Sequence, residues 1–302
     1  MTKKFVFICD ESGAKGYSNQ KESYAGEVGV FAGILIREEW EERVRAAFKS
    51  IYDKYKPSQG KLHIAELESD QQEALREEIF GTLKVLKLPC FWYAIHVEGF
   101  NGWYTFQSGQ LMQARADAAA LHKQPPRIKR GSPRDKPESL HETLFEGLYS
   151  HVLAYVMEQG NTKVEIEVQT DQIDAPIIKN FNVLAKNLLN TDPELTTSKG
   201  YDTVTEKTVT GSVSVHIYIP PELQIDLVIE KLSIATVGSE DELVLAADVL
   251  ANSLNYMFKN RTGSELYAPL NCLEAVASHP LYAELNAFRE WVEGDIGDAL
   301  YR

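Results

Sequence analysis

The segment Phe5-Val-Phe-Ile-Cys-Asp-Glu-Ser-Gly13 decides the plan of the chain, because it joins an apolar run directly to acidic residues. Apart from the cysteine, its first five residues are aromatic or β-branched, which is typical of a buried β-strand. Asp10 follows that run, and Gly13 marks the turn behind it. A carboxylate that ends a buried strand lies at the edge of a sheet, so Asp10 is a candidate functional residue.

A second acid interrupts an apolar stretch near the other end of the chain. The stretch Leu243-Val-Leu-Ala-Ala-Asp-Val-Leu-Ala-Asn-Ser-Leu254 predicts a helix that is apolar on almost all sides, with Asp248 in its middle. A bare carboxylate in such surroundings costs several kcal/mol. A cation shared with other carboxylates is one solution, and an ion pair with a residue such as Lys231 is the other.

A third acid, Asp171, ends the alternating apolar run 164–170. Asp174 competes for this strand-end position, although Ala175-Pro176 behind it favours a helix N-cap. Magnesium and manganese ions prefer oxygen ligands, and two such ions about 3.5–4 Å apart can activate water and brace a phosphate. If the two acid-tipped strands are neighbours, Asp10, Asp171 and Asp248 predict a site for Mg²⁺ or Mn²⁺.

The segment Lys61-Leu-His-Ile-Ala-Glu66 offers a fourth acid with two basic neighbours. Glu66 is the predicted fourth ligand, and Glu11 is the alternative. Lys61 is predicted to contact a phosphate, and His63 to relay a proton or orient the attacking water. Each residue also has a plain structural interpretation, as a first-turn acid at a helix dipole or as part of a solvated loop.

The pattern along the chain predicts a mixed-sheet α/β fold. Strands are expected at 4–9, 28–36, 90–98, 164–170 and 223–232, with a hairpin of 204–210 and 213–218 turning near Gly211. Helices are expected at 38–55, 69–86, 138–159, 176–189, 241–259 and 282–293, with Ser139 and Gly160 bounding the third. We expect one domain over 1–302, with an insertion at about 101–137 and a helical extension at about 262–302.

The composition is that of an ordinary globular protein. Of 302 residues, 44% are hydrophobic and 25% are charged, and no apolar run approaches the roughly 18 residues of a membrane span. The first strand leads directly into acids, so we expect no signal peptide. The three cysteines have no metal-binding spacing, which favours buried thiols and a cytoplasmic protein.

One basic segment contrasts with the net charge of −13, which disfavours broad nucleic-acid binding. Prolines and glycine in this segment predict a mobile loop. It is either an incidental solvated loop or an arm that grips phosphates. The predicted nucleic-acid contacts are its basic residues, Lys123, Arg127, Lys129, Arg130, Arg134 and Lys136.

From about residue 5 to 255 the chain resembles the bacterial and phage family called "domain of unknown function 3800". Members open with a strand that runs into Asp-Glu-Ser-Gly, as at 10–13 here. A Lys/His segment then leads to an acid, as in Lys61-Leu-His-Ile-Ala-Glu66, and a strand-end acid like Asp171 follows. The last match is an Ala-Asp helix, here Ala246-Ala-Asp-Val-Leu-Ala251.

That family is regarded as RNase H-like and as containing metal-dependent nucleases. The resemblance implies a mixed central sheet flanked by helices, a carboxylate metal site, and a role in nucleic-acid defence or conflict. The chain departs from the family pattern in two places. After Gly13 it has Ala14-Lys15, where many relatives have a turn residue such as Asp. Before the late helix aspartate it has Val244-Leu-Ala-Ala-Asp248 instead of the usual Gln-hydrophobic-Ala-Asp. The region from 101 to 136 has no counterpart in the family.

The leading hypothesis is a nuclease that hydrolyses DNA or RNA by a two-metal mechanism. The first alternative is a binding or assembly protein of the same fold without turnover. Its acidic surface suits a protein partner or mimicry of nucleic acid, and a homo-oligomer is the further alternative. The second is an aspartate-based phosphatase with Asp10 as nucleophile. That chemistry usually needs another Asp two residues on, where this chain has Ser12.

Overall fold

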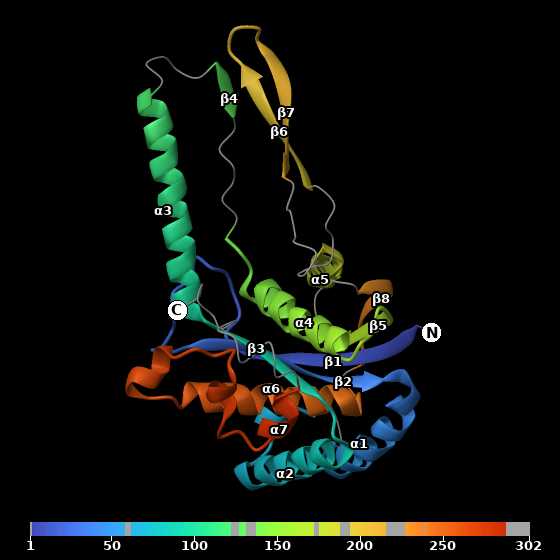
Figure 1. The fold of residues 1–302 in the computed structure, drawn as a ribbon. Helices are drawn as coiled ribbons and strands as arrows, with labels where there is room; N and C mark the ends of the chain where they lie inside the picture. The colour runs from blue at the N-terminus through green and yellow to red at the C-terminus, as the bar shows by residue number, and fades with distance from the viewer. Residues whose placement is uncertain are drawn as a thin grey trace.

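The computed structural model describes residues 2–57, 62–121, 127–130, 137–171, 175–187, 194–215, 227–238 and 240–287. Its centre is a five-stranded mixed sheet with the order β3-β2-β1-β5-β8 (Figure 1). β1 pairs antiparallel with β2 and parallel with β5, while β2–β3 is antiparallel and β5–β8 parallel. The strands are β1 (Lys3–Gly13), β2 (Val28–Arg37), β3 (Cys90–His96), β5 (Lys163–Thr170) and β8 (Val228–Thr236).

Helices cover both faces of this sheet and bury one apolar layer each (Figure 1). Val6 and Ile8 of β1 pack into the layer under α6, whereas Phe5, Phe7 and Cys9 pack into the layer under α4. This alternation is the two-residue period of a strand. One face carries α1 (Glu41–Tyr55), α2 (Ser69–Leu86) and α6 (Glu242–Lys259), and the other carries α4 (Leu140–Glu158) and α5 (Ala175–Asn187).

Local sequence explains where α4 and α6 begin and where α4 ends. Ser139 Oγ accepts a hydrogen bond from the amide of Glu142 at the start of α4, and Gly160, at φ 69°, follows its end. Asp241 accepts two amide hydrogen bonds at the start of α6. These caps satisfy donors that a helix N-terminus leaves open, and the Ser139 cap confirms the sequence prediction.

Short elements complete the main body. Their bounds are η1 (Glu38–Trp40), η2 (Ile64–Glu66), η4 (Gly263–Tyr267), η5 (Leu273–Val276) and α7 (Tyr282–Leu285). The expected C-terminal helical extension therefore consists of short turns up to residue 287. The expected helix at 282–293 ends at Leu285, and its residues from 288 onward lie outside the described part.

A second sheet and a long helix stand away from these layers on the α4 side (Figure 1). The helix is α3 (Val97–Leu121), and the sheet has the antiparallel order β4-β6-β7. Its strands are β4 (Ile128–Arg130), β6 (Glu194–Asp202) and β7 (Lys207–Val215). We call β4, β6 and β7 together the arm sheet.

The arm sheet corrects two sequence predictions. The basic segment is not wholly irregular, because Ile128–Arg130 forms β4 and pairs with Gly200–Asp202. The hairpin turns at 203–206 rather than near Gly211, which lies within β7 opposite Ser198. Glu206, at φ 54°, adopts the left-handed backbone conformation of the turn, for which the sequence pattern had indicated Gly211. β8 likewise begins and ends later than its expected 223–232.

The described helices include none that is long and apolar enough to cross a membrane. The mixed-sheet α/β class predicted from the sequence is confirmed, with the central sheet flanked by helices.

Candidate carboxylate site

Asp10 and Asp171 lie at the same level of two neighbouring strands. The last register pair of the parallel strands β1 and β5 is Cys9 with Thr170, so Asp10 and Asp171 are the next residue of each. Asp10 is only 6% exposed and accepts a hydrogen bond from the amide of Glu11. Asp171 follows the last residue of β5, as predicted, whereas Asp10 lies within β1, which continues to Gly13. The register places the two acids at the same level of neighbouring strands.

Both aspartates lie on the α6 side of the sheet. On β1 this side holds Val6 and Ile8, and two residues beyond Asp10 the Oγ of Ser12 accepts a hydrogen bond of 3.1 Å from Asn255 Nδ2 of α6. On β5 the apolar residues Val164, Ile166 and Val168 belong to the α4 layer. The strand period then places Gln169 and Asp171 on the α6 side.

Asp248 faces this side from the middle of α6. Its side chain is 16% exposed, and its Oδ2 accepts a hydrogen bond of 3.3 Å from the amide of Ile64. His63 Nδ1 lies 3.7 Å from the same oxygen. Asp248 precedes Asn255 by two helical turns, about 10 Å along the axis. The structure therefore joins Asp248 to His63 and places both on the face that holds Asp10.

The remaining predicted ligands occupy other positions. Glu66 is exposed at the end of η2. Glu11 points to the opposite face, where its Oε1 accepts a hydrogen bond of 2.6 Å from Lys15 Nζ and its Oε2 lies 3.8 Å from His141 Nε2. Lys61 lies outside the described residues, and so does Asp174.

The charges around Glu11 explain its protonation state. Burial raises the pKa of Glu11, but the hydrogen bond and charge of Lys15, with the charge of His141, outweigh it and leave that pKa lowered. Burial also lowers the pKa of His141. Glu11 is therefore an ionised partner of Lys15 under the α4 layer, in a position the sequence could not distinguish from that of Asp10.

The donor set of the α6 side suits a hard cation, since the three aspartates present carboxylate oxygens only. In the part of the chain that the structure describes, however, no group of three or more His, Cys, Asp or Glu side chains is arranged to hold a metal ion. A cation there would be held by Asp10 and Asp171 from the sheet and by Asp248 from the helix.

Arg45 of α1, which the sequence pattern did not indicate, ties the supporting elements together. Its guanidinium donates hydrogen bonds of 2.7 Å to Asp241 at the start of α6 and to Gln169 Oε1 of β5. It also binds Glu41 and Glu242. Burial lowers the pKa of Arg45, but these acids reverse the effect and raise it. Arg45 therefore fixes the helix of Asp248 against the strand of Asp171.

The predicted nucleic-acid contacts divide into two groups. Arg127 is held by Asp202 of β6, with Nη2 to Oδ2 at 2.8 Å, and its hydrogen bonds are the main cause of the lowered pKa of Asp202. Lys129 and Arg130 lie in β4. Outside the described residues are Lys123, Arg134 and Lys136.

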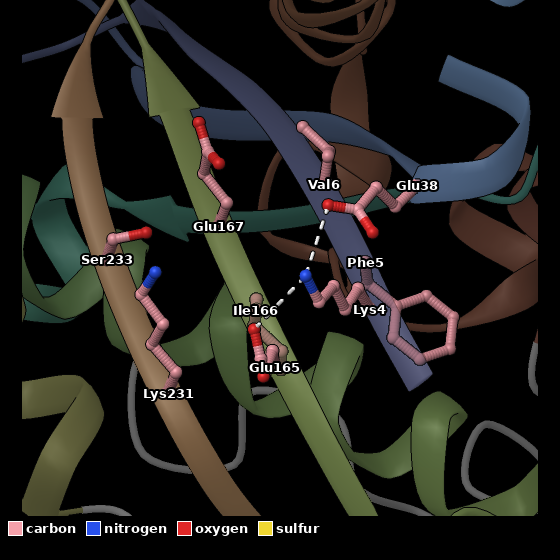
Figure 2. Close-up of a pocket in the computed structure, with 9 residues that line it drawn as sticks. All are labelled: Lys4, Phe5, Val6, Glu38, Glu165, Ile166, Glu167, Lys231 and Ser233. Carbon is pink, nitrogen blue, oxygen red and sulfur yellow. Dashed lines mark ion pairs between the residues drawn. The ribbon is translucent and has the colours of Figure 1, made fainter. Parts of the chain in front are cut away.

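A small pocket opens on the same face of the sheet but away from the aspartates (Figure 2). Lys4 Nζ lies between Glu38 at 3.6 Å and Glu165 at 3.8 Å, and Lys231 and Glu167 complete a mixed-charge lining. Asp171 lies four positions beyond Glu167 in the chain, about 13 Å along an extended strand. The pocket's lysines stand among carboxylates, so it is a poor phosphate site. Lys231, the alternative partner of Asp248, lies here on β8.

Neither a protein-family model nor a curated protein matches this chain.

Proposed function

We propose that the protein is a metal-dependent phosphodiesterase acting on DNA or RNA, with Asp10, Asp171 and Asp248 as its central carboxylates. One observation carries the proposal. In the parallel neighbours β1 and β5, Asp10 and Asp171 directly follow the paired residues Cys9 and Thr170, on the face covered by the helix of Asp248. Three carboxylates that share one face of the sheet repel one another unless a cation or hydrogen-bond donors offset their charge.

The proposal includes an RNase H-like fold of the "domain of unknown function 3800" kind. Its support is the strand order β3-β2-β1-β5-β8, with three antiparallel strands followed by two parallel ones and helices on both faces. A mixed central sheet flanked by helices is what the resemblance to that family implies. The resemblance of the opening Asp10-Glu11-Ser12-Gly13 segment is the sequence argument for the same family.

The chemistry follows from the residues. Bound Mg²⁺ or Mn²⁺ would supply charge for the scissile phosphate and lower the pKa of attacking water. Asp10 fixes one side of the site because sheet hydrogen bonds hold its backbone within β1, and Asp171 directly follows the last residue of β5. His63, 3.7 Å from Asp248, is placed to hold or pass a proton on that side. The exposed Glu66 and the undescribed Lys61 stay secondary candidates.

The test compares hydrolysis of DNA, RNA and small phosphodiesters by the full chain with Mg²⁺, with Mn²⁺ and in EDTA. We expect ion-dependent hydrolysis that Asp10→Asn or Asp248→Asn reduces to the background rate while the circular dichroism spectrum is retained. Calorimetric Mn²⁺ binding should weaken in the same variants. Glu167→Gln is the matched control, because it removes a carboxylate from the same face of β5 outside the site. An active Asp10→Asn, Asp248→Asn double variant would end the proposal.

A second candidate is a protein of this fold that binds its partner without turnover. The observation that favours this candidate is that, within the described ranges, no three acids are arranged to hold a metal ion. The net charge of −13 also suits a protein partner. Mn²⁺ binding without hydrolysis of any phosphodiester would support this candidate over the first.

A further inference from the structure

The arm sheet has one face on which every described side chain is exposed and none is acidic. On β6 this face holds Thr197, Lys199 and Tyr201, and on β7 the register places Thr208 beside Tyr201 and Thr210 beside Lys199. Ser212 continues the row opposite Thr197. We call these six residues the hydroxyl face. Such a face is unusual on a chain with 44 acidic residues.

The opposite face of the arm sheet differs in burial and in charge. Asp202 is buried there and is held by Arg127 and by the amides of Val204 and Thr205. Val209 on the same side is half-buried. The arm sheet therefore has an inner face, which carries the acid, and an outer face of hydroxyls, a lysine and a tyrosine.

We propose that the hydroxyl face binds the sugar-phosphate backbone of a duplex nucleic acid. Lysine and the hydroxyls of Ser, Thr and Tyr are groups that contact phosphates in protein–DNA complexes. Lys199 supplies the positive charge among the described side chains of this face. A carboxylate on this face would repel phosphates, and the described residues place none there.

The same face is poorly suited to a single strand. Surfaces for single strands stack successive bases on several aromatic side chains, whereas Tyr201, 46% exposed, is the one aromatic residue in the described part of this face. Beyond the residues paired with β4, β6 and β7 form a two-stranded ribbon. The major groove of B-form DNA admits a ribbon of this width.

The arm sheet stands on the α4 side, whereas Asp10 and Asp248 lie on the α6 side (Figure 1). The hydroxyl face therefore tethers the nucleic acid rather than presenting the bond that is cut. This step rests on the proposed function only for the class of partner. Changes on the hydroxyl face are expected to raise KM for a polymeric substrate and to leave kcat unchanged.

The experiment measures fluorescence anisotropy of a labelled DNA duplex of about 20 base pairs, two helical turns, with the full chain in EDTA over a series of salt concentrations. Lys199→Glu should weaken binding about ten-fold and lower the salt slope by about 1, the loss of one phosphate contact. The variant Thr208→Val, Thr210→Val, which keeps side-chain shape, should weaken binding less. Lys207→Glu, the same charge change on the inner face, is the matched control and should bind nearly as wild type.

Equal losses for Lys199→Glu and Lys207→Glu would overturn the proposal, since net charge alone would then explain binding. So would tighter binding of the single strand, or a hydroxyl face covered by a second copy in a dimer that Lys199→Glu dissociates. Two outcomes separate the nuclease proposal from the tether proposal. If the arm sheet binds duplex but the wild type does not hydrolyse it, only the nuclease proposal fails. If the wild type hydrolyses duplex and Lys199→Glu does not change that hydrolysis, only the tether proposal fails.

Discussion

His279 and His151 show how burial, rather than a catalytic role, sets the protonation of single residues in this fold. His279 accepts a hydrogen bond from the amide of Leu281 at Nδ1, so its Nε2 carries the proton toward Ser253 Oγ at 2.9 Å. Ser253 in turn donates to the carbonyl of Leu250. The serine hydroxyl is thus committed to the backbone, and this Ser–His contact is a packing pair rather than a nucleophile with its base.

The same burial makes stability depend on pH. Burial lowers the pKa of His279, and that of His151, from 6.5 to about 4. Between these values the unfolded chain binds protons that the folded protein does not, so the free energy of unfolding falls as pH falls from 6.5 toward 4. At about pH 5 each histidine should account for a loss of roughly 2 kcal/mol.

Urea unfolding measures this loss at about pH 5, which lies between the unfolded and folded pKa values, against about pH 7.5, which lies above both. His151→Gln and His279→Gln should each reduce the difference in free energy between the two conditions, whatever they cost at neutral pH. A pH dependence as steep as that of wild type in both variants would show that other groups are responsible.

At the scale of elements, the position of α6 on the sheet depends on a network centred on one cation. α1 supplies Arg45, α6 supplies Asp241 and Glu242 at its first turn, and β5 supplies Gln169. The two α6 acids, which favour the N-terminus of their own helix, would repel one another without the guanidinium. Arg45 therefore stabilises the interface of three elements that the carboxylate site needs in fixed positions.

Replacing Arg45 by Met keeps the apolar stem and removes the charge. We expect a loss of about 2 kcal/mol in the free energy of unfolding, since acids and an amide lose their partner in a half-buried place. Calorimetric Mn²⁺ affinity should also fall, because α6 loses its tie to β5. Arg43→Met, on the exposed side of the same helix, is the control, and an equal effect of both variants would exclude the bridging role of Arg45.

On the scale of the whole molecule, stability is unevenly distributed between the main body and the arm sheet. β1 and β2 lie between two apolar layers, and nearly every residue of β2 is buried. β7 is exposed along most of its described length, and Val209 is half-buried among the arm-sheet residues whose burial the structure describes. Elements with little buried apolar contact open at lower free energy than the core.

Amide hydrogen exchange measures this difference directly. Amides of β6 and β7 should exchange faster than those of β1, β2 and β5, and addition of a DNA duplex should slow exchange in β6 and β7. Proteolytic cleavage at the turn 203–206 should leave the main body folded. Protection of β7 equal to that of β1 in the free protein would contradict this prediction and indicate a cover on the arm sheet.

The sequence predicted those parts of the fold whose signals are local. The buried runs of β1 and β2, the boundaries of α2, and the Ser139 and Asp241 helix starts follow from period, composition and capping residues. The hairpin turn failed, because Gly211 is a common turn residue and its strand is rich in Thr and Ser with weak alternation. The tertiary pairing of β4 with β6 overrode the loop signal of the prolines nearby.

By itself, the sequence determined that Asp10 and Asp171 follow buried apolar runs and that Asp248 interrupts an apolar helix, since each fact depends only on neighbours along the chain. It did not show that β1 continues through Asp10 to Gly13. Only the tertiary structure decided that β1 and β5 are parallel neighbours in a register that levels the two aspartates, and that Glu11 faces away toward His141. Strand pairing and helix placement depend on contacts between residues far apart in the chain, so no local pattern encodes them. Arg45 and the hydroxyl face became visible for the same reason.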